Sequence, residues 1–256
     1  KLIEDRYNTI IKDLGMKLWL QPEFDRIKNA IVHHAGRDYI ASRGEYLNSI
    51  VLANYLGYDF IDAETGIFFK DNGTLDEEKT NEELTAILAS HEHAVIPGFY
   101  GALPNGTIKT FSRGGSDLTG SIVAKAAKVD MYENWTDVSG FMIADPRIIN
   151  NPKSIEAITY KELRELSYMG ATVLHEDAIY PARIANIPIN IRNTNKPEDP
   201  GTMIASEPDK NDDRIISGIA GSKDFTVVAI SKNGLSTERG FIRKLAGILE
   251  DNDIAI

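Results

Sequence analysis

A glycine-rich turn that leads into a helical pattern is the segment of this sequence best suited to chemistry. Residues 111–120 read FSRGGSDLTG and run straight into apolar residues at helical spacing. Glycines let backbone N–H groups converge on one point, and the first turn of a helix adds free donors and a partial positive charge. Arg113 adds a planar donor pair for a carboxylate or phosphate. The segment predicts an anion-binding loop, and the alternative is a tight turn that Asp117 caps.

A second polar segment covers residues 135–147, WTDVSGFMIADPR. Thr136 and Asp137 stand where a predicted strand ends, which is where α/β sheets present polar groups to a nucleotide. Arg147 follows a rigid Asp-Pro step. An ordinary loop after a strand explains this segment about as well.

A third segment is Ser42-Arg43-Gly44-Glu45, at the start of a predicted helix. Serine followed three residues later by glutamate has the spacing of a capping box, and the residues by themselves favour that structural role. The alternative is that Glu45 receives the ammonium group of an amino-acid substrate.

The histidines give little support for a metal site. His91 and His93 flank Glu92 at the end of an acidic helix, where a solvated surface is the stronger interpretation, and His175 is expected to be packed. The sequence has no cysteine, which excludes disulfides, thiolate metal sites and cysteine nucleophiles.

Hydrophobic periodicity supplies the elements that would position these segments. It predicts an α/β fold, a mostly parallel sheet covered by helices on both faces, in which ligands gather at the carboxyl ends of strands. The predicted helices cover residues 1–35 with breaks near Gly15 and Pro22, 42–56, 118–128, a stretch with Leu163, Leu166 and Met169 on its apolar face, and 240–249. The predicted strands cover 93–99, 131–138 and 187–191.

A connector rich in proline and acidic residues lies within residues 193–213 and predicts a domain boundary near residue 207. Beyond it, residues 215–230 are predicted to form a strand pair ahead of the last helix. This β-α-β start is too short to form a core alone.

Composition bounds the class of protein. The chain has 256 residues, 42% hydrophobic and 26% charged, and no apolar run approaches the length of a membrane helix. A net charge of −10 argues against a nucleic-acid footprint. We expect a cytoplasmic protein with no membrane partner. Because the sequence opens inside a helical pattern and closes on an apolar run, we expect an internal piece of a longer protein.

Together these segments resemble the aspartate kinase family, within the amino-acid kinase or carbamate-kinase-like fold, over most of residues 36–204. The motifs are SRGGSD at 112–117, WTDV at 135–138, DPR at 145–147 and MGATVLH at 169–175, in the order and approximate spacing of that family. The resemblance implies that Glu45 and Arg113 bind L-aspartate through its ammonium group and α-carboxylate, with Gly114 and Gly115 in the substrate loop. It also places Ser116 and Asp117 at the site of phosphoryl transfer.

The resemblance further implies that the phosphoryl donor is ATP with Mg²⁺. The implied nucleotide contacts are Thr136, Asp137, Met142, Arg147, Thr172 and Val173. Thr172 stands where many members have lysine, and Met142 where many have an aromatic residue. The family also begins with a strand that carries Lys-Phe-Gly-Gly and its catalytic lysine, and this sequence contains no such segment.

The tail resembles the first half of an ACT domain, the regulatory module that family members carry in tandem. The resulting expectation is an amino-acid kinase domain over residues 1–206, without its first strand, and a partial α+β ACT domain over 207–256. Feedback inhibition by lysine or threonine and a homodimer are implied.

Two other functions stay open. One is a relative in the same fold that acts on glutamate, acetylglutamate or a nucleotide, against which Glu45 and the ACT-like tail argue. The other is a catalytically inactive subunit that binds amino acids.

Overall fold

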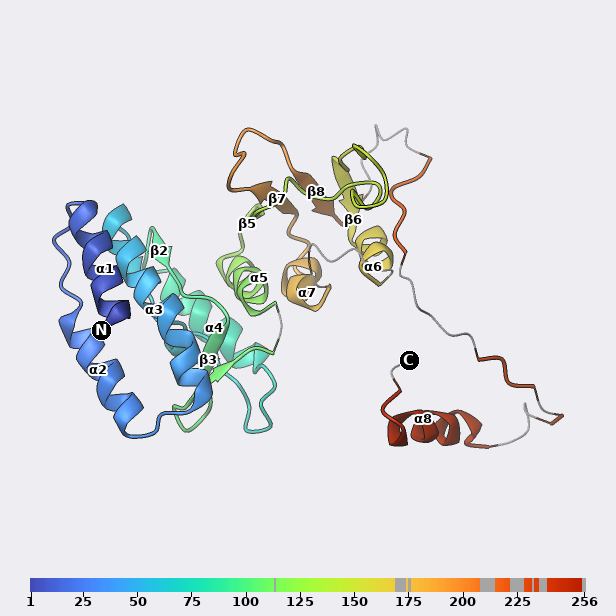
Figure 1. The fold of residues 1–256 in the computed structure, drawn as a ribbon, viewed down its shortest axis with the longest axis horizontal. Coiled ribbons are helices and arrows are strands. Elements are labelled where there is room, and N and C mark those ends of the chain that lie inside the picture. The colour runs from blue at the N-terminus through green and yellow to red at the C-terminus, as the bar shows by residue number, and fades with distance from the viewer. Residues whose placement is uncertain are drawn as a thin grey trace. The chain divides into compact units, whose positions relative to one another are not determined.

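The computed structural model describes residues 1–112, 114–168, 174, 176–207, 215–221, 228–231, 233–234 and 239–254. The chain divides into two compact units, Lys1–Gly221 and Ser222–Ile256 (Figure 1). The helices are α1 (Leu2–Asp13), α2 (Gln21–Val32), α3 (Arg37–Leu56), the 3-10 turn η1 (Ala63–Thr65), α4 (Glu77–Leu88), α5 (Gly115–Ala127), α6 (Tyr160–Tyr168), α7 (Glu176–Ile184) and α8 (Phe241–Asp251). The strands are β1 (Asp59–Phe60), β2 (Ala94–Val95), β3 (Tyr100–Ala102), β4 (Ile108–Thr110), β5 (Tyr132–Thr136), β6 (Ala157–Thr159), β7 (Ile189–Asn193) and β8 (Thr202–Ala205).

The strands form three hydrogen-bonded sheets in which parallel pairs outnumber antiparallel ones. The largest has the order β5-β7-β8-β6, with β5 parallel to β7, β6 parallel to β8, and β7 antiparallel to β8. β1 pairs with β2 in parallel, and β3 with β4 as an antiparallel hairpin. The predicted α/β class with a parallel-rich sheet is confirmed.

The main core lies between the four-stranded sheet and helices α5, α6 and α7. Alternate residues Ile189 and Ile191 of β7, with Ile204 of β8, are fully buried. They pack with Leu163 of α6 and Ile179 of α7 in one cluster. Figure 1 shows these three helices on the same side of the sheet. Each such side chain stabilises the fold by about 1.5–3 kcal/mol, so this cluster fixes β5 and β7 against α5.

A second core joins the N-terminal helices to the short strands. Phe24 of α2 and Leu47 of α3 are buried in one cluster, with Phe60 of β1 packed against it. Ile96, one residue beyond β2, packs instead against the cluster of α4 and α5 that contains Leu84 and Ile122. The β1–β2 pair therefore lies between α3 on one side and α4 with α5 on the other.

The predicted start of the helix at residue 42 is wrong, because α3 begins at Arg37 with Gly36 as its N-cap. The Asp38 carboxylate accepts a hydrogen bond of 3.2 Å from the Thr110 backbone N–H, which ties the first turn of α3 to β4. Ser42 therefore lies inside the helix, where its Oγ donates to the Tyr39 carbonyl at 2.8 Å. The capping-box interpretation of Ser42 and Glu45 is wrong.

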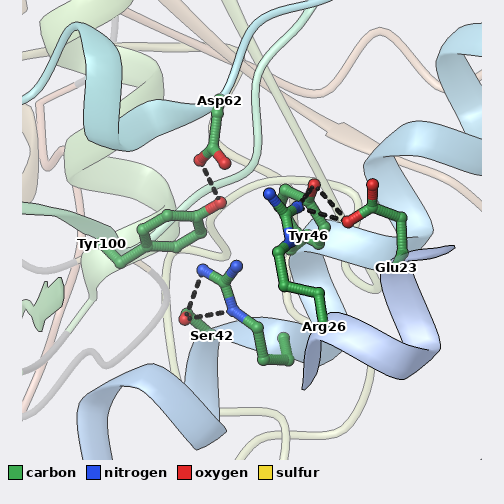
Figure 2. Close-up of polar contacts among 7 residues, drawn as sticks. Glu23, Arg26, Ser42, Tyr46, Asp62 and Tyr100 are labelled. Atoms are coloured by element: carbon green, nitrogen blue, oxygen red, sulfur yellow. Dashed lines mark hydrogen bonds and ion pairs between the residues drawn. The ribbon is translucent and has the colours of Figure 1, made fainter. Parts of the chain in front are cut away.

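A partly buried polar cluster joins α2, α3 and β3 with Asp62, the N-cap of η1. Arg43 is 6% exposed, and its guanidinium lies 4.4 Å, 4.5 Å and 5.4 Å from the ring centres of Tyr39, Tyr46 and Tyr100. The Tyr100 hydroxyl donates to Asp62 Oδ1 at 2.7 Å. Figure 2 shows this contact beside the hydrogen bonds that join Tyr46 to Arg26 and to Glu23. Cation–π contacts of this kind gain strength when water is excluded, so the cluster anchors α3 to β3.

Burial and charge shift several pKa values in this cluster. Burial raises the pKa values of Tyr100 and Tyr46 above their ordinary range, with nearby carboxylates adding to the effect. Burial, then the Asp62 charge, also raises the pKa of Glu64. The tyrosine hydroxyls therefore stay protonated and available as donors.

The other predicted elements are placed as follows. Gly15 follows the end of α1, whereas Pro22 lies in the first turn of α2, where its missing N–H is tolerated. The predicted helix 118–128 is α5, which begins three residues earlier, and the predicted helix 240–249 is α8. Met169 lies outside the described residues.

The chain beyond residue 207 is described only in part. Residues 215–221 and 228–230 contain no strand, and the rest of the predicted strand pair lies outside the described residues. The Ile219 N–H donates to the Ile143 carbonyl at 2.7 Å, so the first unit extends to Gly221. Every helix in the described ranges is too short or too polar to cross a membrane.

Candidate active site

The start of α5 packs closely against the residue before β3 and the residue after β4. A Cβ atom on Gly115 would lie 2.7 Å from Phe99 Cβ and 2.9 Å from Phe111 Cβ. Gly114, the N-cap, has a φ of +58°, which glycine adopts without strain. Only glycine therefore lets the loop turn into α5 this close to the two phenylalanines, as the GG step of the sequence predicts.

Hydrogen bonds then fix both sides of this turn. The Thr119 Oγ1 accepts from the Phe99 N–H at 3.0 Å and donates to the Gly115 carbonyl at 2.8 Å. The Phe111 N–H donates to the Phe99 carbonyl at 2.9 Å. Phe99 itself has a φ of +61°, an uncommon value for a bulky residue that this packing enforces. The first turn of α5 is thus pre-organised.

Asp117 turns sideways to β5 rather than back to the end of α5. Its Oδ1 accepts a hydrogen bond of 2.8 Å from Asn134 Nδ2, and Asn134 Nδ2 also donates to the Tyr132 hydroxyl at 2.9 Å. The Tyr132 hydroxyl donates to the Asp117 carbonyl at 3.3 Å. Burial raises the pKa of Tyr132 to about 12, against the opposing effect of the Asn134 hydrogen bond. The alternative in which Asp117 is a plain helix cap is wrong.

A cavity of about 710 Å³ brings together Glu45, a predicted substrate residue, and Ser116, a predicted residue of the phosphoryl-transfer site. Glu45 of α3 and Ser116 of α5 both line it, with Gly98, Thr119 and Gly120. Glu45 is half-buried, and its charge adds to burial in raising the pKa of Tyr7, whose hydroxyl donates to the Gly44 carbonyl at 2.9 Å. A carboxylate and a helix N-terminus on one cavity suit a ligand that carries both charges.

The predicted nucleotide residues follow β5. Thr136 ends the strand beside Asn193, and its Oγ1 donates to Asp137 Oδ1 at 3.3 Å. Met142 is 44% exposed, and the Arg147 side chain is 85% exposed. The Arg147 guanidinium donates to both oxygens of Asp145 and lowers the pKa of that carboxyl.

Three predicted site residues, Arg113, Thr172 and Val173, lie outside the described residues, as does His175. His91 is less solvated than predicted, because its Nδ1 lies 2.7 Å from Asp59 Oδ2. Within the described ranges, no three histidine, aspartate or glutamate side chains gather as metal ligands.

Asn134 and Thr119 are the site residues that sequence reasoning missed. Asn134 is 8% exposed, on the same face of β5 as Thr136. The sequence did offer one signal for Asn134. It is a polar residue at an inward-facing position of the predicted strand, two residues before Thr136. Thr119 gave none beyond its place in the loop sequence.

Comparisons with known proteins identify the family of this chain. The sequence profile of the amino acid kinase family matches residues 5–193. Aspartokinase 3 of Bacillus subtilis (strain 168) is 37% identical over 229 residues, which are 85% of this chain and 49% of that protein. The chain spans about half the length of the curated relatives it matches.

Solved structures give the same family. The crystal structure of Clostridium acetobutylicum aspartate kinase is 55% identical, with a TM-score of 0.89, over 97% of this chain and 57% of that one. E. coli aspartokinase III shows the fold in complex with aspartate and ADP (R-state), at 23% identity and a TM-score of 0.73, over 94% and 59% of the two chains. The same enzyme with lysine and aspartate (T-state) has 24% identity and a TM-score of 0.68, over 92% and 57%. Because the family profile covers most of its length, this chain belongs to the amino acid kinase family.

Proposed function

We propose that the protein carrying this chain is an aspartate kinase, which transfers the γ-phosphoryl group of ATP to the β-carboxylate of L-aspartate. The observation that carries this proposal is the shared cavity of Glu45 and the pre-organised first turn of α5. The names of the similar proteins support the choice of aspartate over other acceptors.

The cavity suggests how aspartate would be held. Glu45 receives the ammonium group, and Arg113 receives the α-carboxylate from the loop before α5. Gly114 and Gly115 bring backbone N–H groups to the same ligand, because they hold the turn close to Phe99. Ser116 and Asp117, in the first turn of α5, lie where the transferring phosphoryl group would pass.

Phosphoryl transfer to this carboxylate needs little acid or base catalysis from the protein. The β-carboxylate of aspartate has an ordinary pKa of about 3.9 and is already ionised at neutral pH. Its oxygen forms a bond to the γ-phosphorus while the bond to the bridging oxygen breaks, and ADP leaves with that oxygen. The product is aspartyl phosphate, a mixed anhydride, and the work of the protein is positioning and charge compensation.

ATP would bind at the carboxyl end of β5, with Mg²⁺ as part of the nucleotide substrate. Thr136 and Asp137 end that strand, Met142 and Arg147 follow in the next loop, and Thr172 and Val173 precede α7. The aspartate and ADP complex of the E. coli enzyme supports ATP as the donor.

Trapping of the product tests this proposal. The intact enzyme with MgATP and hydroxylamine should form the hydroxamate of aspartate, and should form little from glutamate or acetylglutamate. Phosphorylation of one of the other acceptors in preference to aspartate would refute the choice of substrate.

Substitution of Arg113 tests the assigned binding mode. Arg113→Ala should raise the KM for aspartate much more than that for ATP. A charge-assisted contact worth about 2–4 kcal/mol corresponds to a loss of about 30- to 1,000-fold in kcat/KM. Equal effects on the two substrates would contradict the assignment.

We also propose that the region from residue 207 onward belongs to an ACT module that carries feedback inhibition and supports a homodimer. The E. coli enzyme in complex with lysine makes lysine the first candidate inhibitor, and threonine is the second. Inhibition curves on the intact enzyme and on a form truncated near residue 207 test this. Inhibition that survives truncation would place the regulatory site elsewhere.

A further inference from the structure

Asn134 is a polar side chain of β5 that hydrogen-bonds the Asp117 carboxylate. It is 8% exposed on β5, yet both hydrogens of its amide are used, one on Asp117 Oδ1 at 2.8 Å and one on the Tyr132 hydroxyl at 2.9 Å. A buried amide is unfavourable unless its hydrogen bonds are made, so its place in β5 is tied to these partners.

Asp117 has a second arrangement open to it. It is the third residue of α5, whose first-turn N–H groups have no partner within the helix. Side chains at this position commonly turn back to such donors. Instead, its Oδ1 accepts the hydrogen bond from Asn134 on β5, and no side chain of the described residues caps the first turn of α5.

Gly120 leaves the space that Tyr132 needs to reach the backbone of Asp117. A Cβ atom on Gly120 would lie 2.4 Å from the Tyr132 hydroxyl. Glycine is unfavourable in a helix interior, but here it lets that hydroxyl reach the Asp117 carbonyl at 3.3 Å. Tyr132 thus hydrogen-bonds the backbone carbonyl of Asp117, and Asn134 hydrogen-bonds its side chain.

We propose that Asn134 is a positioning residue for phosphoryl transfer, which acts by holding the Asp117 carboxylate toward the reacting groups with Tyr132 as its support. This inference rests on the proposed function, in which Asp117 lies at the transfer site. Because Asn134 acts through Asp117, its loss should lower kcat and leave the KM values for aspartate and ATP within about twofold.

The test is a double-mutant cycle on kcat in the intact enzyme, with Asn134→Leu and Asp117→Ala. Asn134→Leu should lower kcat about 10- to 100-fold in the wild-type background, equivalent to about 1.4–2.7 kcal/mol. In the Asp117→Ala background it should cause less than about a twofold further loss. Glu133→Gln, the adjacent residue on the opposite face of β5, is the matched control and should keep its activity.

Equal losses of kcat in both backgrounds would mean general damage to β5 and would overturn the inference, as would an unchanged kcat.

If the wild-type enzyme forms no aspartyl hydroxamate, the proposed function fails separately. The contact is then tested by the side-chain amide signals of Asn134 in protein labelled at asparagine. These signals should shift in Asp117→Ala and stay in place in Ser116→Ala, and the reverse pattern would refute the contact.

Discussion

Replacing Gly115 with alanine should disable the site while leaving the protein folded. The new methyl carbon would lie 2.7 Å from Phe99 Cβ and 2.9 Å from Phe111 Cβ. The closer distance is about 0.7 Å below the 3.4 Å at which ordinary contact begins. Neither Cβ atom can rotate away, because each is fixed to its own backbone, and Phe99 is already held at a φ of +61°.

The first turn of α5 must therefore move by several tenths of an ångström. Overpacking of this kind lowers the free energy of unfolding by about 1–3 kcal/mol. A misplacement of about 1 Å in a catalytic group can lower the rate about 100-fold. We expect Gly115→Ala to lose stability within that range and to lose about 30- to 100-fold in kcat/KM, because Asp117 moves with the turn.

Gly106→Ala is the matched control. Gly106 lies in the β3–β4 turn with a φ of +79°, and a Cβ atom added there would meet no other atom within 4 Å. The substitution therefore introduces backbone strain of about 1–2 kcal/mol and no clash. Urea unfolding should show similar losses of stability in the two variants, and the hydroxamate assay should show a loss of activity in Gly115→Ala alone. Equal activities in the two variants would refute the argument that the close packing of Gly115 positions the site.

Three further predictions concern stability, measured by urea unfolding. Tyr100→Phe removes the 2.7 Å hydrogen bond to Asp62 and should lower the free energy of unfolding by about 1.5–3 kcal/mol, with a smaller loss in an Asp62→Asn background. Burial raises the pKa of Glu64, so its ionised form destabilises the folded state; Glu64→Gln should raise stability near neutral pH and have no effect below about pH 4.5. Burial by itself would raise the pKa of Asp38, but hydrogen bonds from Thr110 and Lys109 outweigh that effect and lower the pKa. Asp38→Asn should therefore lower the free energy of unfolding at neutral pH. The difference between the two proteins should vanish as acid protonates Asp38. A pH-independent effect at either carboxyl would contradict the assigned cause.

Short sequence patterns predicted the elements that depend on residues close together along the chain. The glycine loop before α5, the end of β5 at Thr136 and the amphipathic helix α8 all follow from spacing along the chain. These features depend on backbone geometry and periodicity, which are written into short stretches of sequence.

Features that depend on distant residues were missed or misplaced. The start of α3 is set by Asp38, whose partner Thr110 lies 72 positions away, so the serine at position 42 was mistaken for a cap. Asp117 could not be separated from a capping residue, because its partner Asn134 lies on another element. Hydrogen bonds between elements decide such cases, and no local propensity reports them.

One edge of the short strand β2 has no partner among the described strands, and this affects how the chain behaves as an isolated polypeptide. β2 pairs only with β1, and β5 only with β7, among the strands in the described ranges. Ala94 of β2 and Ile96 after it line the 710 Å³ cavity, so the unpaired backbone groups of β2 run beside apolar side chains. An open strand edge can pair with strands from other chains. Expressed alone, the chain should scatter light increasingly with concentration, and a soluble peptide of β-strand character should suppress that association.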